Sequence, residues 1–350
     1  MLAAGMRTCY TEKEMSVRTG GRGGMLVSDT MRENTEGFRL VGALIDETER
    51  VILGKRGAIE QVVTALLAGG HVLIEDVPGT GKTTLATAIA RAAGLSCTRA
   101  QFTPDVMASD ITGFTIYNKA ADRFEYRPGL VMCNILLADE INRTSPKTQS
   151  ALLEAMEEGC VTVDGETHKL PEPFMVIATQ NEHGYVGTFP LPEAQLDRFL
   201  IRVKLGYPSA EEEADIISQR KMFNPLEAIS PVLTRKEVLL LREAVRRVHI
   251  EDSLYDYIVR LVRATREHPA VMLGCSPRAS LSLMRASQAH AFIAGRSYVT
   301  PSDVQELFHA VAAHRILISQ EAKLRRVSSG QVVREALERE TVPLTGRKRA

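Results

Sequence analysis

The sequence lacks tryptophan, and aromatic residues of any kind make up only 5% of its 350 residues. This composition disfavours a ligand cage built on tryptophan and says little else about function. No apolar run approaches the roughly 18–20 residues of a membrane-spanning helix, and the N-terminus lacks the apolar stretch of a secretory signal. The sequence therefore predicts a protein without a membrane span.

Cysteine and histidine are too scattered to indicate a disulfide framework or a zinc site. The eight histidines form no HExxH or HxxxH pattern. The cysteines are odd in number, and no two are spaced as in a zinc knuckle or a CxxC motif. The five are Cys9, Cys97, Cys133, Cys160 and Cys275. We therefore expect reduced thiols and a cytoplasmic location.

An excess of either charge is also missing, because 43 Lys and Arg balance 43 Asp and Glu. A polycation that coats nucleic acid is thus disfavoured, although a local basic patch is not. Hydrophobic residues make up 44% and charged residues 25%, which is ordinary for a globular protein. At roughly 100–200 residues per domain, the length predicts two domains.

Hydrophobic periodicity divides the chain into four parts. Residues 1–37 are glycine-rich without apolar periodicity and are expected to be a disordered tail. In 38–207, short apolar strands alternate with helices, which predicts an α/β domain around a parallel sheet covered on both faces. Strand signals then stop, and 208–320 shows the pattern of a smaller all-helical domain. Residues 321–350 are expected to be a helical end and a polar tail.

A phosphate-binding loop follows the predicted strand at 71–74 and opens a helix. It reads Asp76-Val77-Pro78-Gly79-Thr80-Gly81-Lys82-Thr83. In such loops backbone N–H groups wrap phosphates, the lysine reaches the β- and γ-phosphates and the hydroxyl binds Mg²⁺. The strict pattern has glycine where this chain has Asp76. Since a carboxylate beside a triphosphate would repel it, we expect Asp76 to point away.

Two later strands end in polar residues that suit hydrolysis. The strand at 134–138 runs into Asp139 and Glu140, where one carboxylate could hold Mg²⁺ and the other could activate water. An acidic helix start is the alternative explanation. The strand at 174–179 leads to Asn181, whose amide could orient the attacking water. A simple turn at Asn181 explains that pattern equally well.

In this order the segments resemble the AAA+ ATPases, and within them the MoxR family. The resemblance spans about 38–320 and rests on the segments 71–84, 101–105, 109–113, 134–143, 149–156, 177–181, 190–199 and 276–279. It implies a P-loop NTPase core with a helix-two insert and a pre-sensor β-hairpin, followed by a lid domain. It also implies ATP and Mg²⁺ as ligands.

The resemblance assigns a role to each candidate residue. Glu140 belongs with Asp139 to the Walker B motif, Asn181 to sensor 1, Arg198 to an arginine finger and Arg278 to sensor 2. The nucleotide-binding residues are Val77, Pro78, Gly79, Thr80, Gly81, Lys82, Thr83 and Thr84, with Ile52 and Gly54 at the adenine; Thr83 and Asp139 serve the metal. An internal ion pair near Asp197 is the alternative role for Arg198, and helix capping or surface pairing for Arg278. Arg143 is a weaker candidate for contact with a neighbour.

The two inserts are expected to be hairpins, at 110–126 and at 161–170. In a ring of the resembled family both would face the pore or the axial surface, whereas the plainer alternative makes them packed edges. The tight turn of the second is predicted at Asp164-Gly165.

The leading hypothesis is a Mg²⁺-dependent ATPase that forms a hexameric ring and remodels or matures a protein partner, as a chaperone does. The resemblance suggests a partner with a von Willebrand factor A domain. A nucleic-acid translocase is an alternative, but the hairpins mix basic and acidic residues and form no electrostatic funnel. The motor subunit of a metal chelatase is another. A module that only binds nucleotide is disfavoured, because Glu140 and both arginines are present.

Overall fold

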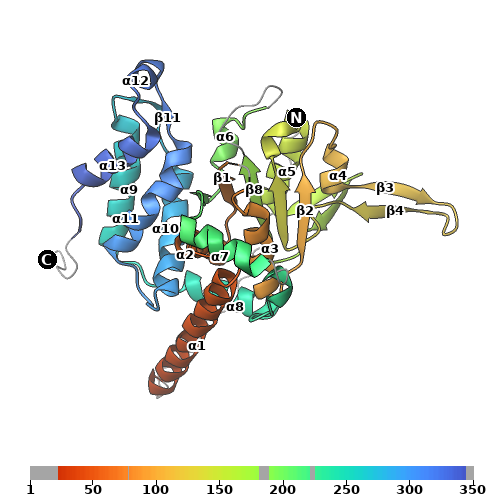
Figure 1. The fold of residues 1–350 in the computed structure, drawn as a ribbon, viewed down its shortest axis with the longest axis horizontal. Coiled ribbons are helices and arrows are strands. Elements are labelled where there is room, and N and C mark those ends of the chain that lie inside the picture. Colours follow the sequence, from red (N-terminus) through yellow and green to blue (C-terminus); the bar gives the residue numbers. More distant parts are fainter. Residues whose placement is uncertain (1–22, 78, 181–188, 221–224, 344–350) are drawn as a thin grey trace, which may run out of the picture.

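The structure is a computed structural model, and it describes residues 23–77, 79–180, 189–220 and 225–343. A parallel sheet covered by helices forms one domain, and a helical lid packs beside it (Figure 1). The predicted α/β core and helical lid are thereby confirmed. In the described residues no helix is both long and apolar enough to cross a membrane.

The central sheet has five parallel strands in the order β2-β5-β8-β1-β9. They are β1 (Val72–Glu75), β2 (Cys97–Gln101), β5 (Ile135–Asp139), β8 (Met175–Gln180) and β9 (Ile201–Val203). The three inner strands are almost wholly buried because helices cover both faces. Since the strands are parallel, the loops after β1, β5 and β8 leave from one edge of the sheet.

The helices of the α/β domain lie around this sheet. They are α1 (Gly23–Glu49), α2 (Arg56–Ala68), α3 (Lys82–Ala92), α4 (Ala108–Thr112), α5 (Pro146–Glu158) and α6 (Glu193–Leu196), with a short 3₁₀ turn at Ile141–Arg143. Successive residues of a strand face opposite sides, so Val72 and Ile74 belong to one core cluster and Leu73 to the other. The second cluster includes Leu152 and Leu153 of α5.

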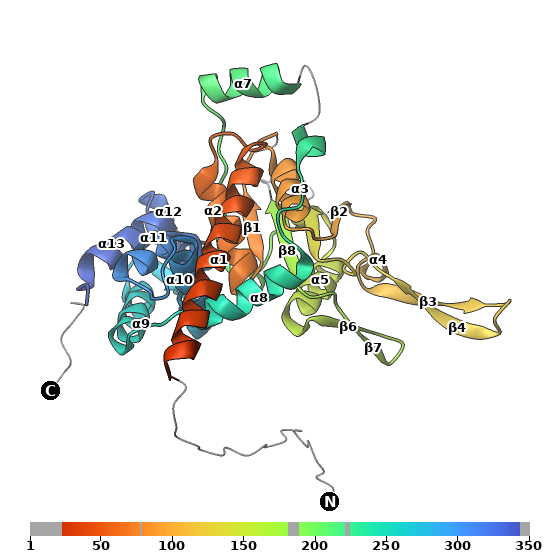
Figure 2. The same cartoon turned by 90° about the horizontal axis from the view of Figure 1, so that it is seen from below.

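The lid follows a linker that contains α7 (Ala210–Arg220) and a 3₁₀ turn at Pro225–Ala228. Its helices are α8 (Arg235–Arg246), α9 (Asp252–Glu267), α10 (Pro277–Ile293), α11 (Pro301–Ala312), α12 (Gln320–Leu324) and α13 (Ser329–Arg339), with a 3₁₀ turn at Ala313–Arg315. A short antiparallel pair, β10 (Val271–Leu273) and β11 (Leu317–Ile318), was not predicted. Figure 2 shows α7 standing apart from the body.

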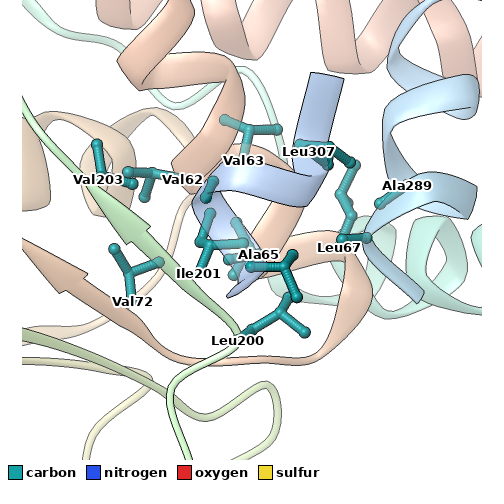
Figure 3. Packing of buried hydrophobic residues seen from close by; sticks show 14 of the residues in the cluster. Val62, Val63, Ala65, Leu67, Val72, Leu200, Ile201, Val203, Ala289 and Leu307 are labelled. Atoms are coloured by element: carbon teal, nitrogen blue, oxygen red, sulfur yellow. The ribbon is translucent and has the colours of Figure 1, made fainter. Parts of the chain in front are cut away.

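The lid and the α/β domain share one hydrophobic core. Leu67 of α2, Leu200 next to β9, and Ala289 and Leu307 of the lid belong to a single buried cluster (Figure 3). Because this apolar surface is continuous across the junction, the hydrophobic effect opposes separation of the two domains.

Helix α1 starts earlier in the chain than the sequence predicts, whereas a helical end after residue 320 is what the sequence predicts. Helix α1 begins at Gly23, so the predicted tail is wrong for residues 23–37. Once Val41 and Leu44 are buried in the core, each further helical residue adds a hydrogen bond without a new nucleation cost. At the other end α13 lies in the predicted helical end and buries Val332 and Val333 against the lid.

Both predicted hairpins are present and project from the α/β domain (Figures 1 and 2). The first pairs β3 (Gly113–Asn118) with β4 (Arg123–Pro128), and the second pairs β6 (Cys160–Val163) with β7 (Glu166–Lys169). Asp164 and Gly165 have φ values of 51° and 84°, as a tight hairpin turn requires. The ring of Tyr126 stacks on that of His168 at 3.7 Å, which connects the two hairpins.

Candidate nucleotide-binding site

The loop between β1 and α3 has the backbone of a phosphate cradle. Gly79 and Gly81 have φ values of 86° and 87°, in the left-handed region that favours glycine, and no atom lies within 4 Å of a Cβ built at either. Gly81 is the N-cap of α3, so Lys82, Thr83 and the following Thr84 form its first turn. Open backbone N–H groups at a helix start bind anions well.

Asp76 points away from this cradle, as predicted. Its Oδ2 accepts hydrogen bonds from the backbone N–H groups of Leu205 (2.7 Å) and Gly206 (2.6 Å). Its Oδ1 accepts one from Val77 (2.8 Å), and the residue is buried. The carboxylate therefore ties the start of the loop to the end of β9, and both of its oxygens are directed at backbone N–H groups instead of into the cradle. Pro78 lies outside the described residues, and Thr80 donates a hydrogen bond to the carbonyl of Val77 (3.3 Å).

Lys82 lies among the acidic residues of the predicted site. Its Nζ donates to the backbone carbonyl of Asp76 at 2.6 Å. Burial lowers the pKa of Lys82, while the negative charges of Asp76, Asp139 and Glu140 oppose that shift. The fold thus brings Walker A and Walker B side chains to the same edge of the sheet.

The Walker B carboxylates have partners that the sequence analysis missed. Asp139 Oδ1 accepts from Thr179 Oγ1 (2.7 Å), and its Oδ2 pairs with Arg99 (2.8 Å). Glu140 has a left-handed backbone, φ 56°, and its N–H donates to Thr179 Oγ1 (2.9 Å). Its carboxylate pairs with Arg143 of the same chain (2.8 Å). A left-handed glutamate is strained, which is typical of a functional position.

The strand that leads to Asn181 lies between the two strands that carry the phosphate loop and the acidic pair. β8 lies between β5 and β1, and Gln180 at its end donates to Glu75 Oε1 at 2.7 Å. Asn181 itself is outside the described residues, so its sensor role stays a prediction.

The candidate adenine residues lie beside the linker between the two domains. Ile52 is buried. Gly54 has φ 70°, and a Cβ there would lie 1.6 Å from Glu212 Oε1 of α7. Lys55 donates to the carbonyl of Tyr207 just before α7 (2.8 Å). A nucleotide base held here would therefore contact the segment that joins core and lid.

Arg198 and Arg278 lie near each other, but at the opposite edge of the sheet from the phosphate loop. Arg198 lies just before β9, whose start is marked by the bond from the Leu200 N–H to the His71 carbonyl (2.8 Å). β9 runs parallel to β1, so the phosphate loop leaves from the opposite ends of these strands. Both arginines form ion pairs with Glu157 of α5.

A surface pocket of about 270 Å³ opens beside Arg198. Its lining comprises Ser150, Leu153, Glu154, Glu157, Glu158, Gln195 and Arg198. The alternative role for Arg198, an internal ion pair, is present in the structure, but the partner is Glu157, and Asp197 pairs with Arg315 of the lid (2.7 Å). The surface pairing that is the alternative role for Arg278 is present as well, with the same Glu157.

Comparison with known families defines the class of protein. Residues 71–201 match the model of the ATPase family associated with various cellular activities (AAA), and residues 263–336 match the AAA lid domain. A crystal structure described as that of a candidate ATPase from Cytophaga hutchinsonii superposes with a TM-score of 0.86. It is 35% identical and covers 92% of this chain and 100% of its own. The chain is an AAA+ ATPase by fold and family.

Two curated relatives narrow the class. The chain is 41% identical over 308 residues to the Chaperone MoxR1 of Mycobacterium tuberculosis, covering 85% of this chain and 81% of the relative. It is 50% identical over 305 residues to the uncharacterized protein YeaC of Bacillus subtilis, and the match covers 87% of this chain and 95% of the relative. The chain therefore belongs to the MoxR family.

Proposed function

We propose that the protein is a Mg²⁺-dependent ATPase that forms rings, completes its active sites between neighbouring subunits and remodels or matures a protein partner. One observation carries the proposal. The phosphate loop and the acidic pair lie at one edge of the sheet, whereas the two candidate transition-state arginines lie beyond the other. Such a site becomes complete only when a second copy supplies the arginines.

The residues at the loop fit a nucleotide with its metal. Both loop glycines leave the cradle open, and the acidic Asp76 is turned away from it. Gly79, Gly81 and the N-terminus of α3 would hold the phosphates, and the positive charge of Lys82 would offset their negative charge. Thr83 and Asp139 would hold Mg²⁺, which offsets phosphate charge during transfer. Mg²⁺ keeps several waters, so few protein ligands suffice.

Each catalytic side chain then has one task. Glu140, released from its pair with Arg143, would accept the proton of the attacking water. Asn181 would orient that water. Arg198 and Arg278 would stabilise the charge that develops on the transferred phosphoryl group, from the adjacent subunit.

The first hairpin supports a protein as the partner. Phe114, Tyr117 and Phe124 are 48%, 49% and 74% exposed, and the rings of the last two lie 5.3 Å apart. Exposed aromatic groups on a projecting element are typical of protein interaction sites. A relative is named a chaperone, which agrees with this assignment. A partner with a von Willebrand factor A domain remains our specific suggestion, as do a hexameric ring and a cytoplasmic location.

The alternatives gain less support. Around the aromatic cluster, Arg123 pairs with Glu125 (3.0 Å), and Tyr117 bonds to Asp122. Because the positive charge of Arg123 is paired with a carboxylate, this part of the hairpin is poorly suited to bind the phosphate backbone of a nucleic acid. Among the described residues, no group of three His, Cys, Asp or Glu side chains could hold a metal, so no site supports chelatase cargo.

The experiment that tests the proposal compares Lys82→Ala with Glu140→Gln in ATP binding and phosphate release. Lys82→Ala should lose affinity for ATP, because it removes the positive charge at the phosphates. Glu140→Gln should bind ATP and hardly hydrolyse it, because Asp139 is kept. In Glu140→Gln with ATP, the client should stay bound and be identifiable by pull-down. Equal loss of ATP binding in both variants would contradict the assigned roles.

A further inference from the structure

Glu157 is the carboxylate that joins the two arginines. Its Oε2 pairs with Arg198 Nη1, and its Oε1 pairs with Arg278 Nη2. Arg198 belongs to the α/β domain, whereas Arg278 stands in the first turn of α10 in the lid. A single side chain of α5 thus bridges the domains at the point where their two candidate transition-state groups meet.

The arginines need such a bridge because they carry like charges. Burial and the nearby charge of Arg278 both lower the pKa of Arg198, and the negative charge of Glu154, one turn earlier in α5, opposes that shift. Two guanidinium groups this close repel each other unless an anion lies between them. Glu157 supplies that anion and restricts two long side chains that would otherwise sample many rotamers.

The backbone that carries the pair is already held in place by other contacts. Asp197 accepts hydrogen bonds from Ser276 Oγ (2.7 Å), the N-cap of α10, and from Arg315 Nε (2.7 Å). Arg315 is buried and also donates to the carbonyls of Phe199 (2.6 Å) and Leu200 (3.2 Å). The residues next to both arginines are therefore fixed across the domain junction, and Glu157 decides where the guanidinium groups lie.

Glu157 leaves hydrogen-bond donors on both arginines. A guanidinium group has five N–H donors. Arg198 Nη1 donates to Glu157 and to the carbonyl of Leu153 (3.2 Å). The Nε of Arg198 is buried without a partner in the described part of the chain. Arg278 pairs with Glu157 through Nη2. Because the buried Nε of Arg198 is out of reach of a phosphate, Nη2 of Arg198 and the remaining N–H groups of Arg278 are the donors that would bind phosphate oxygens while each fork stays paired with Glu157.

We propose that Glu157 is a positioning residue for ATP hydrolysis, which holds Arg198 and Arg278 as one preorganised pair for the nucleotide of the neighbouring subunit. This inference rests on the proposed function. Glu157 touches no phosphate itself and acts through the two arginines.

The test is the Glu157→Gln variant, which keeps the size of the side chain and removes its charge. A displacement of about 1 Å can cost about 100-fold in rate, so we expect kcat to fall by about 10- to 100-fold. The Kd for ATP should not change, because the phosphate loop is remote. Glu158→Gln is the matched control. It alters the next residue of the same helix, in the same pocket, and should hydrolyse ATP at the parent rate.

Mixing subunits separates positioning from a folding defect. Glu157→Gln keeps an intact phosphate loop, and Lys82→Ala keeps an intact arginine pair. Mixed rings should therefore regain activity at each interface where the phosphate loop of a Glu157→Gln subunit meets the arginine pair of a Lys82→Ala subunit. A rate for Glu157→Gln at or above the parent's, or a loss without rescue, would overturn the inference.

Arg198→Ala, measured in parallel, separates this inference from the proposed function. If Arg198→Ala hydrolyses ATP like the parent, the intersubunit mechanism itself fails. If only Arg198→Ala is slow and Glu157→Gln is normal, the mechanism stands and Glu157 has no positioning role.

Discussion

Replacing Asp76 with glycine would restore the strict phosphate-loop pattern, and the structure predicts that this change harms the protein. The buried carboxylate accepts three backbone hydrogen bonds, from Val77, Leu205 and Gly206, at 2.6–2.8 Å. Each buried N–H group left without an acceptor costs about 1–3 kcal/mol. Glycine removes both acceptor oxygens and with them all three hydrogen bonds, and it also adds backbone freedom to the unfolded chain.

Asparagine at position 76 is the milder change. Its single oxygen can replace Oδ2 and keep the bonds to Leu205 and Gly206, but its amide group then faces the Val77 N–H. We expect Asp76→Asn to lower the free energy of unfolding by about 1–3 kcal/mol, and Asp76→Gly by at least twice as much. ATP affinity should fall in the same order, because the start of the loop loses its anchor on β9.

Urea unfolding followed by circular dichroism measures the stability change, and ATP titration measures the affinity. Asp256→Asn, an exposed aspartate of α9, is the control and should match the parent within about 0.5 kcal/mol. If Asp76→Gly is as stable as the parent, or binds ATP more tightly, the three hydrogen bonds do not hold the loop. The consensus pattern would then be the better guide.

Three further changes test other parts of the molecule. The Arg296 guanidinium lies 2.6 Å from buried Asp303 and helps hold the pKa of that carboxyl well below its usual range. The ionised Asp303 carboxylate should therefore stabilise the fold above about pH 4, and this contribution should disappear as the pH falls toward the lowered pKa. Asp303→Asn should cost about 3–5 kcal/mol at pH 7 in urea unfolding and flatten the acid dependence; an unchanged pH profile would argue against this. Arg198→Ala should bind ATP normally, hydrolyse it about 10³-fold more slowly and regain activity when mixed with Lys82→Ala in a phosphate-release assay; failure of the mixture would place Arg198 in its own subunit's site. Phe124→Ser should weaken client capture in the pull-down without changing basal hydrolysis, and undiminished capture would remove the first hairpin from the client surface.

The elements that touch nucleotide could be predicted because their signals are local. A glycine-rich loop between a buried strand and a helix, or two carboxylates at a strand end, can be recognised within a dozen residues. The cap of α11 is similar, since the capping box of Thr300 and Asp303 is a pattern of four consecutive residues. The hairpin turn at Asp164-Gly165 was also predictable, because a tight turn demands residues that tolerate positive φ.

Other features depend on residues far apart in the sequence. No local pattern shows that Asp76 reaches the backbone at 205–206, or that Thr179 and Arg99 share Asp139. The extension of α1 back to Gly23 likewise follows from tertiary packing further along that helix, and not from the composition of residues 23–37.

The sequence by itself determined the fold class, the order of the motifs and the identity of the charged groups, because backbone geometry and hydrophobic periodicity act over short distances. Only the tertiary structure decided which charges meet. Glu157 joins Arg198 and Arg278 across 41 and 121 positions, and Arg315 reaches Asp197 across 118. Such pairs form where the sheet and the lid bring separate helices together, and electrostatic attraction depends on distance in space, not on separation along the chain.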